Sequence, residues 1–157
     1  MTVFLKKMSE EFFLPYMERM IKEYAKEKVV AGTWLEEESE KRATQEINNL
    51  LPEGLHTKNH FLLEITTEDS GKGIGSLWVR FDPENMQKEA FIYDFFIQPE
   101  ERDKGYGKAT LFALEDYVRL LGAKKLSLHV FGHNERAIHL YKKVKFQVTD
   151  LVMSKML

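Results

Sequence analysis

The sequence predicts an α/β protein, with a central mixed β-sheet that carries helices on both of its faces. Apolar residues recur at helical spacing in the first third of the chain, over 10–30 and 36–51. The period then changes to that of strands rich in β-branched and aromatic residues, over 60–67, 74–81 and 89–97. Helical segments at 109–121 and 134–144 follow, and a strand at 125–131 separates them.

Local signals set the boundaries of these elements. A short strand at 2–8 precedes the first helix, which Gly32 ends. Segment 89–97 is almost entirely apolar, which is typical of a central strand covered on both faces. Gly122 suits the position just past the end of the helix at 109–121. We also expect a turn at 69–73 and two closing strands, at 146–148 and 152–156.

The composition predicts one packed domain over residues 1–157. Hydrophobic residues make up 43% and charged residues 31%, which allows a core and disfavours disorder. The net charge of −2 provides no basic field for nucleic acid, so we expect no nucleic-acid partner. The chain has no cysteine, which excludes disulfides, thiolate zinc sites and cysteine nucleophiles. The N-terminus has no long apolar leader and no window approaches the ~18 apolar residues that span a bilayer, so we expect a cytoplasmic protein without a membrane partner.

The most informative segment joins the strand at 89–97 to the next helix. It reads Ile97-Gln98-Pro99-Glu100-Glu101-Arg102-Asp103-Lys104-Gly105-Tyr106-Gly107-Lys108. A glycine-bearing turn between a strand and a helix directs backbone N–H groups and the positive end of the helix dipole toward a phosphate. An ordinary turn is the alternative, because a lone Gly-x-Gly is weak evidence. A P-loop would need glycine at Arg102 and Ser or Thr at Ala109, and a dinucleotide fingerprint would need glycine at Thr110, so both are excluded.

A second motif is Asn134-x-x-Ala137-x-x-x-Tyr141, with Phe146 beyond it. Its structural explanation is an N-cap asparagine followed by core-facing helix residues. In the functional interpretation, the Tyr141 hydroxyl lies at the open edge of the sheet near the turn. A phenol there can protonate a leaving thiolate.

Together, the two motifs resemble those of the GNAT superfamily of acetyl-CoA-dependent N-acetyltransferases. The resemblance covers residues 61–146 by motif order and implies a GNAT-like acyl-CoA N-acyltransferase fold. One departure is Val144-Lys145-Phe146, where many members have Leu-Gly-Phe. Segments 32–35 and 50–55 also resemble a small bacterial subgroup of undefined substrate.

The resemblance implies a binding site for coenzyme A. In the family, the Arg-x-x-Gly-x-Gly turn binds the pyrophosphate, and the preceding strand splays from its neighbour at a bulge and pairs with the pantetheine arm. Asn134 matches a residue that contacts the pantetheine or phosphate region, and Tyr141 matches the general acid. A backbone N–H near Phe96 would stabilise the oxyanion. The implied cofactor-binding residues are Phe95, Phe96, Ile97, Arg102, Asp103, Lys104, Gly105, Tyr106, Gly107, Lys108 and Asn134.

The general base is left open between two carboxylates and water. Glu89 matches a catalytic glutamate of family members that acetylate ribosomal-protein N-termini, and Asp94 matches a substrate-side acid of others. The structural alternatives are a solvated strand-end charge for Glu89 and a paired acid for Asp94. Glu64, on an earlier strand, is a weaker candidate.

Two further sets of residues invite a functional interpretation. Trp34 with the acidic run 36–38 would suit the wall of a site for a cationic amine, although acidic residues also favour a helix start. The histidines at 129, 133 and 139 are spread over a strand, a loop and a helix without a flanking carboxylate pair, so no metal site is expected.

These observations predict an acyltransferase that moves an acetyl group from acetyl-CoA, as co-substrate, to a primary amine by direct attack in a ternary complex. No covalent enzyme intermediate is required, which agrees with the absence of cysteine. The acceptor is a small-molecule or peptide amine: a peptide N-terminus, a polyamine, an aminoglycoside-like drug or a metabolite. The protein is expected to be a monomer or homodimer. The alternatives are a non-catalytic acetyl-CoA or CoA sensor module on the same fold, and an interaction protein without a cofactor.

Overall fold

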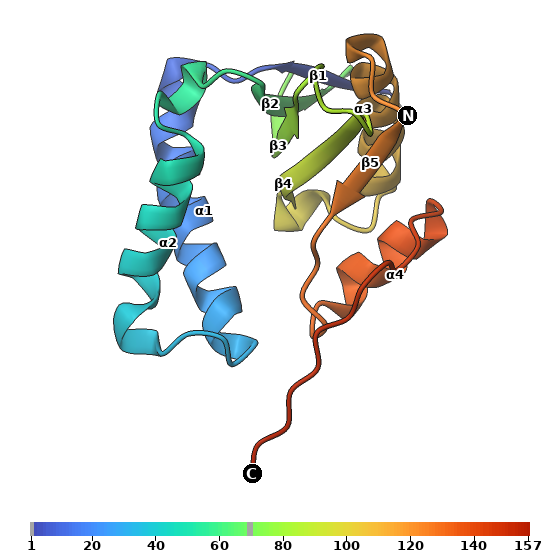
Figure 1. The fold of residues 1–157 in the computed structure, drawn as a ribbon. Coiled ribbons are helices and arrows are strands. Elements are labelled where there is room, and N and C mark those ends of the chain that lie inside the picture. Colours follow the sequence, from blue (N-terminus) through green and yellow to red (C-terminus); the bar gives the residue numbers. More distant parts are fainter. Residues whose placement is uncertain (1, 69–70) are drawn as a thin grey trace.

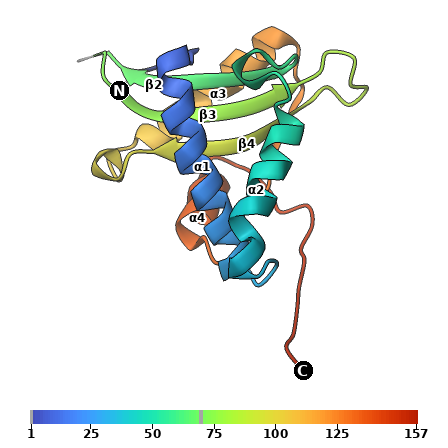
Figure 2. The same ribbon diagram turned by 90° about the vertical axis from the view of Figure 1, so that its left-hand side faces the viewer.

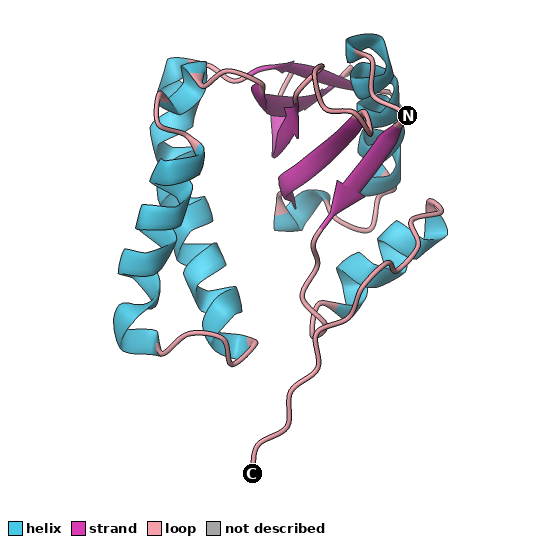
Figure 3. Cartoon of the chain, viewed as in Figure 1, coloured by secondary structure: helices cyan, strands magenta, loops and turns pink. Residues whose placement is uncertain are grey.

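A computed structural model describes residues 2–68 and 71–157 (Figure 1). Figure 3 shows the helices and strands of these residues, joined by loops and turns. Among these helices, none is long and apolar enough to cross a membrane. The element order is β1 Val3–Lys7, α1 Glu10–Val30, α2 Glu36–Leu50, β2 His60–Thr67, β3 Gly73–Phe81, β4 Glu89–Ile97, α3 Tyr106–Leu121, β5 Lys125–Leu128 and α4 Glu135–Lys143, with short 3-10 turns at Gly54–His56 and Pro99–Glu101.

The strands of the described residues form one mixed sheet in the order β1-β2-β3-β4-β5. The first four strands are antiparallel neighbours, and β5 is parallel to β4. Parallel neighbours need a crossover connection, which α3 supplies here. The α/β class predicted from the sequence is therefore confirmed.

Helices cover both faces of this sheet (Figures 1 and 2). On one face, Leu111 of α3 joins a core that includes Leu77 of β3. On the other face, Met20 of α1 and Ile47 of α2 pack with Trp78 of β3. Successive residues of a strand point to opposite faces, so Leu77 and Trp78 enter different cores.

Strand β4 loses its neighbour on one side halfway along its length. Its pairing with β5 begins at Glu89 opposite Lys125 and stops at Ile92 opposite Leu128. Pairing with β3 continues, but the register shifts between Trp78 and Val79, which makes Tyr93 a bulged extra residue. Among the described residues, the backbone of 93–97 therefore has no partner strand on the β5 side. This is the splayed, bulged strand that the sequence resemblance predicted.

Several boundaries differ from the sequence-based prediction. Strand β5 ends at Leu128 rather than at residue 131, and α3 begins at Tyr106 rather than at residue 109. The earlier start is possible because Gly105 provides a left-handed N-cap, with φ of 87°. Residues 69 and 70 of the predicted turn at 69–73 lie outside the described residues.

The two closing strands predicted at 146–148 and 152–156 are wrong. Neither segment forms a strand, and residues 147–157 are exposed. Their apolar composition raises β propensity, but a strand also needs a partner to pair with. Among the described residues, neither segment has a partner strand.

Candidate functional site

The turn after β4 brings the N-terminus of α3 to the C-terminal end of that strand. Gly105 is the N-cap of α3, and no side chain caps the first turn. The N–H groups of a first helical turn have no intrahelical acceptor, so those of Tyr106, Gly107 and Lys108 can bind an anion. The helix dipole adds positive potential at the same place.

The two glycines of this turn have different roles. Gly105 has φ of 87°, a left-handed conformation that glycine adopts readily. Gly107 lies within the helix, where an added Cβ would lie 3.0 Å from Cδ2 of Leu140 on α4. Gly107 therefore allows α3 and α4 to approach each other. Gly107, which the sequence motif assigns to ligand contact, therefore has a packing role as well.

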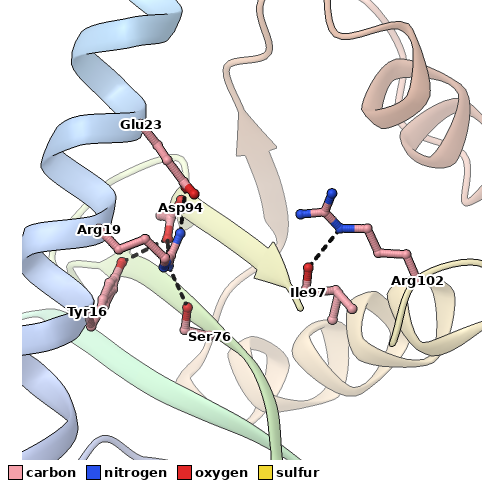
Figure 4. Close-up of polar contacts among 7 residues, drawn as sticks. All are labelled: Tyr16, Arg19, Glu23, Ser76, Asp94, Ile97 and Arg102. Carbon is pink, nitrogen blue, oxygen red and sulfur yellow. Dashed lines mark hydrogen bonds and ion pairs between the residues drawn. The ribbon is translucent and has the colours of Figure 1, made fainter. Parts of the chain in front are cut away.

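Arg102 holds a positive charge at the junction of β4 and the turn. Its Nε donates a hydrogen bond of 2.8 Å to the carbonyl oxygen of Ile97. Its guanidinium also lies 5.5 Å from the ring centroid of Phe96. Figure 4 shows its terminal nitrogens pointing away from Ile97, so they are left for another acceptor.

Ion pairs fix the rest of the turn. Asp103, with φ of 60°, lies 2.8 Å from Arg136 of α4 through a carboxylate oxygen and a guanidinium nitrogen. The Lys104 ammonium lies 3.0 Å from the Glu101 carboxylate. The first of these pairs links the turn to the start of α4, the helix that carries Tyr141.

Backbone groups along the end of β4 point alternately toward β3 and away from it. The Gln98 N–H donates to the Ile74 carbonyl of β3 at 2.8 Å. An added Cβ on Gly75 would lie 2.1 Å from the Phe96 carbonyl oxygen, so that carbonyl also faces β3. Because neighbours alternate, the N–H groups of Phe95 and Ile97 face the side where β5 has ended. These are the amides that an extended ligand can reach.

Side chains at the end of β4 divide between the two faces. The Phe96 ring lies beneath the Arg19 guanidinium of α1, with the guanidinium carbon 3.7 Å from the ring centroid. Phe95 and Ile97 belong to the core on the α3 face. The strand therefore offers its backbone, rather than these two side chains, to the open side.

Asp94 joins β4 to α1 through largely buried polar contacts (Figure 4). The Tyr16 hydroxyl donates to Oδ2 of Asp94 at 3.0 Å, and Nη2 of Arg19 lies 3.6 Å from the same oxygen. Arg19 also donates to the Ser76 hydroxyl at 3.2 Å and pairs with Glu23 at 2.6 Å. Burial raises the pKa of Asp94, and the Arg19 charge and the Tyr16 hydrogen bond oppose that rise. A carboxylate with a raised pKa is a stronger base than a solvated one.

The sequence motifs did not reveal the α1 members of this cluster. Tyr16, Arg19 and Glu23 recur at i, i+3 and i+7, so they share one face of the helix. They border the apolar stripe that buries α1 against the sheet. A row of polar residues at helical spacing beside such a stripe is the signal that could have identified them.

Tyr141 is half-buried on α4 and packs at the edge of the α3-side core. Its ring meets that of Phe146 edge-on, with centroids 5.6 Å apart. Lys145, which replaces the glycine common in the resembling pattern, has φ of 77° and turns the chain so that Phe146 N–H bonds to the Tyr141 carbonyl at 2.9 Å. Burial and the negative charge of Asp94 raise the pKa of Tyr141. Its phenol is therefore protonated at neutral pH and can donate a proton.

Asn134 acts as the N-cap of α4. Its side-chain oxygen accepts a hydrogen bond of 3.2 Å from the Ala137 N–H. The structural explanation considered for this residue thus holds. Its side-chain NH₂ still has donors to offer to a ligand.

The other candidate carboxylates have structural partners. Glu89 lies at the start of β4, with a carboxylate oxygen 3.0 Å from the Lys125 ammonium. A strand rise of roughly 3.3 Å per residue puts it about 17 Å from Asp94. Glu64 pairs with Lys6 at 3.1 Å and accepts from the Ser9 hydroxyl at 3.5 Å. Asp94 lies close enough to Tyr141 for its charge to act on the phenol, whereas Glu89 lies at the opposite end of β4. Glu64 lies opposite Ser76 of β3, which accepts a hydrogen bond from Arg19.

Trp34 and the acidic run after it also have structural roles. Trp34 is only 5% exposed and packs edge-on against Tyr24, with the Arg42 guanidinium 4.8 Å from its ring centroid. The run 36–38 forms the first turn of α2, where acidic residues favour the helix dipole. Trp34 therefore packs α1 against α2.

His133, in the loop after β5, lies against α1. His133 pairs with Glu27 of α1, and Phe131 stacks on His133. Across the residues that the structure describes, no group of three or more His, Cys, Asp or Glu side chains could hold a metal ion.

The chain is similar in sequence to known acetyltransferases. Residues 16–146 match the model of the acetyltransferase (GNAT) family. The uncharacterized N-acetyltransferase YycN of Bacillus subtilis (strain 168) is 46% identical over 100% of both chains. YdgE, an uncharacterized N-acetyltransferase of the same strain, is 39% identical over 98% of this chain and 97% of its own.

Solved structures have the same fold. The crystal structure of YycN matches with a TM-score of 0.95, covering 99% of each chain. Spermidine N-acetyltransferase from Vibrio cholerae, solved with CoA and spermine, matches with a TM-score of 0.65 at 17% identity, covering 99% of this chain and 87% of that one. The family match spans both sequence motifs, α2 and most of α1, and the two Bacillus relatives extend the similarity over nearly the whole chain. This chain belongs to the acetyltransferase (GNAT) family and is an N-acetyltransferase.

Proposed function

We propose that this N-acetyltransferase transfers the acetyl group of acetyl-CoA directly to a primary amine while both substrates are bound, with residues 1–157 acting as one domain. The observation that supports this is the junction of β4 and α3. There the half of β4 that has no partner on the β5 side is followed by Arg102 and then by the N-terminus of α3, which has no side-chain cap. An extended arm along the strand and a pyrophosphate at the helix form one continuous path.

The proposed cofactor contacts follow this path. The N–H groups of Phe95 and Ile97 pair with the pantetheine arm, and the ring of Phe96 supports the strand from the α1 side. The backbone of 102–108 and the cations Arg102, Lys104 and Lys108 bind the pyrophosphate. Asp103 holds the turn through Arg136, and Asn134 offers its side-chain NH₂ from the start of α4.

The chemistry needs one base, one acid and one oxyanion donor. The amine nitrogen attacks the thioester carbonyl carbon, and the N–H of Phe95 or Ile97 stabilises the resulting oxyanion. Collapse of the intermediate breaks the C–S bond, and Tyr141 gives its proton to the departing thiolate. The amine proton passes to Asp94, directly or through water. Glu89 lies at the far end of β4 from Asp94, and the charge of Asp94 acts on Tyr141, which favours Asp94 or water over Glu89.

The acceptor is proposed to be a small-molecule or peptide amine. Asp94 and Glu23 place two carboxylates against the single charge of Arg19, which leaves this side of the site acidic. An acidic site attracts a cationic amine before it is deprotonated. Release of CoA thiol, measured over a panel of peptide, polyamine, aminoglycoside and metabolite amines, tests the acceptor class.

The variant Tyr141→Phe tests the reaction itself. Removal of the phenol proton is expected to lower kcat about 100-fold or more, because general acids contribute roughly 10²–10⁴ to rate. Affinity for acetyl-CoA should change little, because the ring and its packing against Phe146 remain. Steady-state kinetics and calorimetric titration with acetyl-CoA measure the two quantities.

Tyr117→Phe is the matched control. Tyr117 is a half-buried tyrosine of α3 whose ring packs edge-on against Phe61, away from Asp94. This variant should keep the kcat of the native chain. Native turnover by Tyr141→Phe would remove Tyr141 from the role of general acid, and failure of the native chain to bind acetyl-CoA would overturn the whole proposal.

A further inference from the structure

Arg19 of α1 reaches the sheet beside Asp94, where its guanidinium bridges two carboxylates (Figure 4). Nη2 of Arg19 lies 3.6 Å from a carboxylate oxygen of Asp94 and donates to the Ser76 hydroxyl at 3.2 Å. Nη1 donates to the Glu23 carboxylate at 2.6 Å. One positive charge is therefore shared between a carboxylate of the sheet and a carboxylate of the helix.

The surroundings of this guanidinium hold it in place. Its central carbon lies 3.7 Å from the ring centroid of Phe96, a distance at which a cation is attracted to an aromatic face. The Ser76 hydroxyl that accepts from it belongs to a side chain on β3 that is only 1% exposed. The Arg19 charge thus has a fixed position between α1 and the bulged end of β4.

The two carboxylates that share the charge differ in their exposure to water. The side chain of Asp94 is 20% exposed, whereas that of Glu23 is 50% exposed. Burial raises the pKa of Asp94, and the charge of Arg19 and the hydrogen bond from Tyr16 lower it. The charge of Glu23 acts in the same direction as burial. Arg19 and Glu23 therefore have opposite effects on the ionisation of Asp94.

The other groups that face Asp94 are neutral phenols. Burial raises the pKa of Tyr16 on α1, and the neighbouring Asp94 adds to that rise. Burial and the charge of Asp94 likewise raise the pKa of Tyr141 on α4. Both phenols therefore stay protonated near neutral pH. Of the groups in the described structure that act on the titration of Asp94, Arg19 and Glu23 are the ones that carry charge there.

We propose that Arg19 is a positioning residue for acetyl transfer: it keeps the Asp94 carboxylate ionised and in place at the bulge of β4, and Glu23 sets how much of its charge acts on Asp94. This inference rests on the proposed function, in which the attacking nitrogen loses its proton to an oxygen of Asp94. That oxygen can accept the proton only while the carboxylate is ionised. The proton then leaves to solvent, and Arg19 itself neither gains nor loses one.

The variant Arg19→Met removes the charge and keeps a side chain of similar length. Because an opposite charge at this range changes the ionisation constant of a carboxyl roughly tenfold or more, kcat/KM on the acid side of its pH profile should fall about tenfold or more. The alkaline plateau should change much less. Every variant is measured with the same amine, so the ionisation of the acceptor is common to all. A merely structural role would lower kcat/KM equally at every pH.

Two further variants separate charge from packing. Glu23→Gln leaves the Arg19 charge to Asp94 alone, so the acid limb of the pH profile should move to lower pH, opposite to its movement in Arg19→Met. Arg19→Lys keeps the charge, and its acid limb should lie close to that of the native chain.

The matched control is Arg42→Met. Arg42 also pairs with a glutamate of its own helix, Glu38, at 3.1 Å, and its guanidinium lies 4.8 Å from the ring centroid of Trp34. It thus makes the same two kinds of contact within the α1–α2 layer without reaching Asp94. This variant should keep the native pH profile.

Titration of the Asp94 carboxyl by ¹³C NMR tests the inference without an activity assay. The signal is identified by its loss in Asp94→Asn. Its midpoint should move to higher pH in Arg19→Met and to lower pH in Glu23→Gln, and Arg42→Met should leave it unchanged. An unmoved midpoint in Arg19→Met, or movement in the same direction in both variants, overturns the role of Arg19. If Arg19→Met does not fold, the direction of movement in Glu23→Gln decides.

Failure of the proposed function has a different signature. Asp94→Asn with native turnover and a native pH profile would show that Asp94 is not the base, and the catalytic role of Arg19 would fall with it even if the carboxyl midpoints move as expected. Loss of turnover in Asp94→Asn together with an unmoved midpoint in Arg19→Met would overturn the inference on Arg19 alone.

Discussion

At the scale of single residues, Gly75 controls how closely β3 and β4 approach beside the proposed cofactor path. An added Cβ would lie 2.1 Å from the Phe96 carbonyl oxygen, a backbone atom that cannot rotate away. Gly75→Ala is expected to destabilise the fold by about 1–3 kcal/mol or more, as overpacking does. It should also weaken CoA binding, because the amides of Phe95 and Ile97 move with the strand. Thermal denaturation and CoA titration measure both effects.

The same strand offers a control for this change. Gly73 also lies on β3, but an added Cβ there has no neighbour within 4 Å. Gly73→Ala should leave both the melting temperature and CoA affinity near native values. Equal behaviour of the two variants would contradict the close approach at Gly75.

His60 should make the free energy of unfolding depend on pH. Its Nδ1 accepts a hydrogen bond of 2.9 Å from the Trp78 indole N–H, and burial and the Arg80 charge lower its pKa from 6.5 to about 4. The unfolded chain therefore binds this proton more readily than the folded one. The stabilising contribution of neutral His60 to the folded state is complete above pH 6.5 and is lost as pH falls from 6.5 toward 4. Because the ring is partly exposed, it amounts to about 1–2 kcal/mol.

Replacing the histidine checks this pH dependence. His60→Gln should flatten the fall in urea-unfolding stability over that range of pH, because the amide oxygen can still accept from Trp78 without titrating. His56→Gln is the control, since the His56 side chain is 76% exposed and lies beside Glu10. A slope that His60→Gln leaves unchanged would assign the acid sensitivity to other groups.

At the scale of elements, the β4–α3 connection explains how a weak sequence motif can form the proposed anion site. Arg102 is tied to the end of the strand, and the helix begins at once after Gly105. Arg102→Met removes the charge and the anchoring hydrogen bond, so Kd for CoA should rise about 10- to 100-fold. Calorimetric titration of CoA checks this.

The control for that prediction lies at the other end of α3. Arg119 is exposed and pairs with Glu115 and Asp116 on the surface of the same helix. Arg119→Met should bind CoA as the native chain does. If Arg102→Met also does so, the pyrophosphate binds elsewhere.

The elements themselves could largely be predicted from the sequence, and the exceptions share a cause. The helical period of α1 and the strand period of β2 and β3 are local signals, and they were interpreted correctly. The closing strands at 146–148 and 152–156 were not, because β structure depends on a partner strand that local propensity does not reveal. The bulge at Tyr93 likewise depends on the register with β3.

At the scale of the whole molecule, the candidate site forms where the two helical layers meet at β4. The α1 layer contributes Tyr16 and Arg19, and the α4 side contributes Tyr141, with Asp94 between them. His133 and Glu27 join the same two sides again beyond the sheet.

The sequence by itself determined the α/β class, the order of helices and strands as far as α4, and the two motifs that resemble those of the family, because these depend on residue periods and turn chemistry within short segments. It could not determine which carboxylate lies near Tyr141, which amides of β4 are open, or that segment 147–157 forms no strand. Those properties depend on distances between segments far apart in the chain. Asp94 rather than Glu89 lies close to Tyr141 because the bulge, the end of β5 and the packing of α1 and α4 place it there.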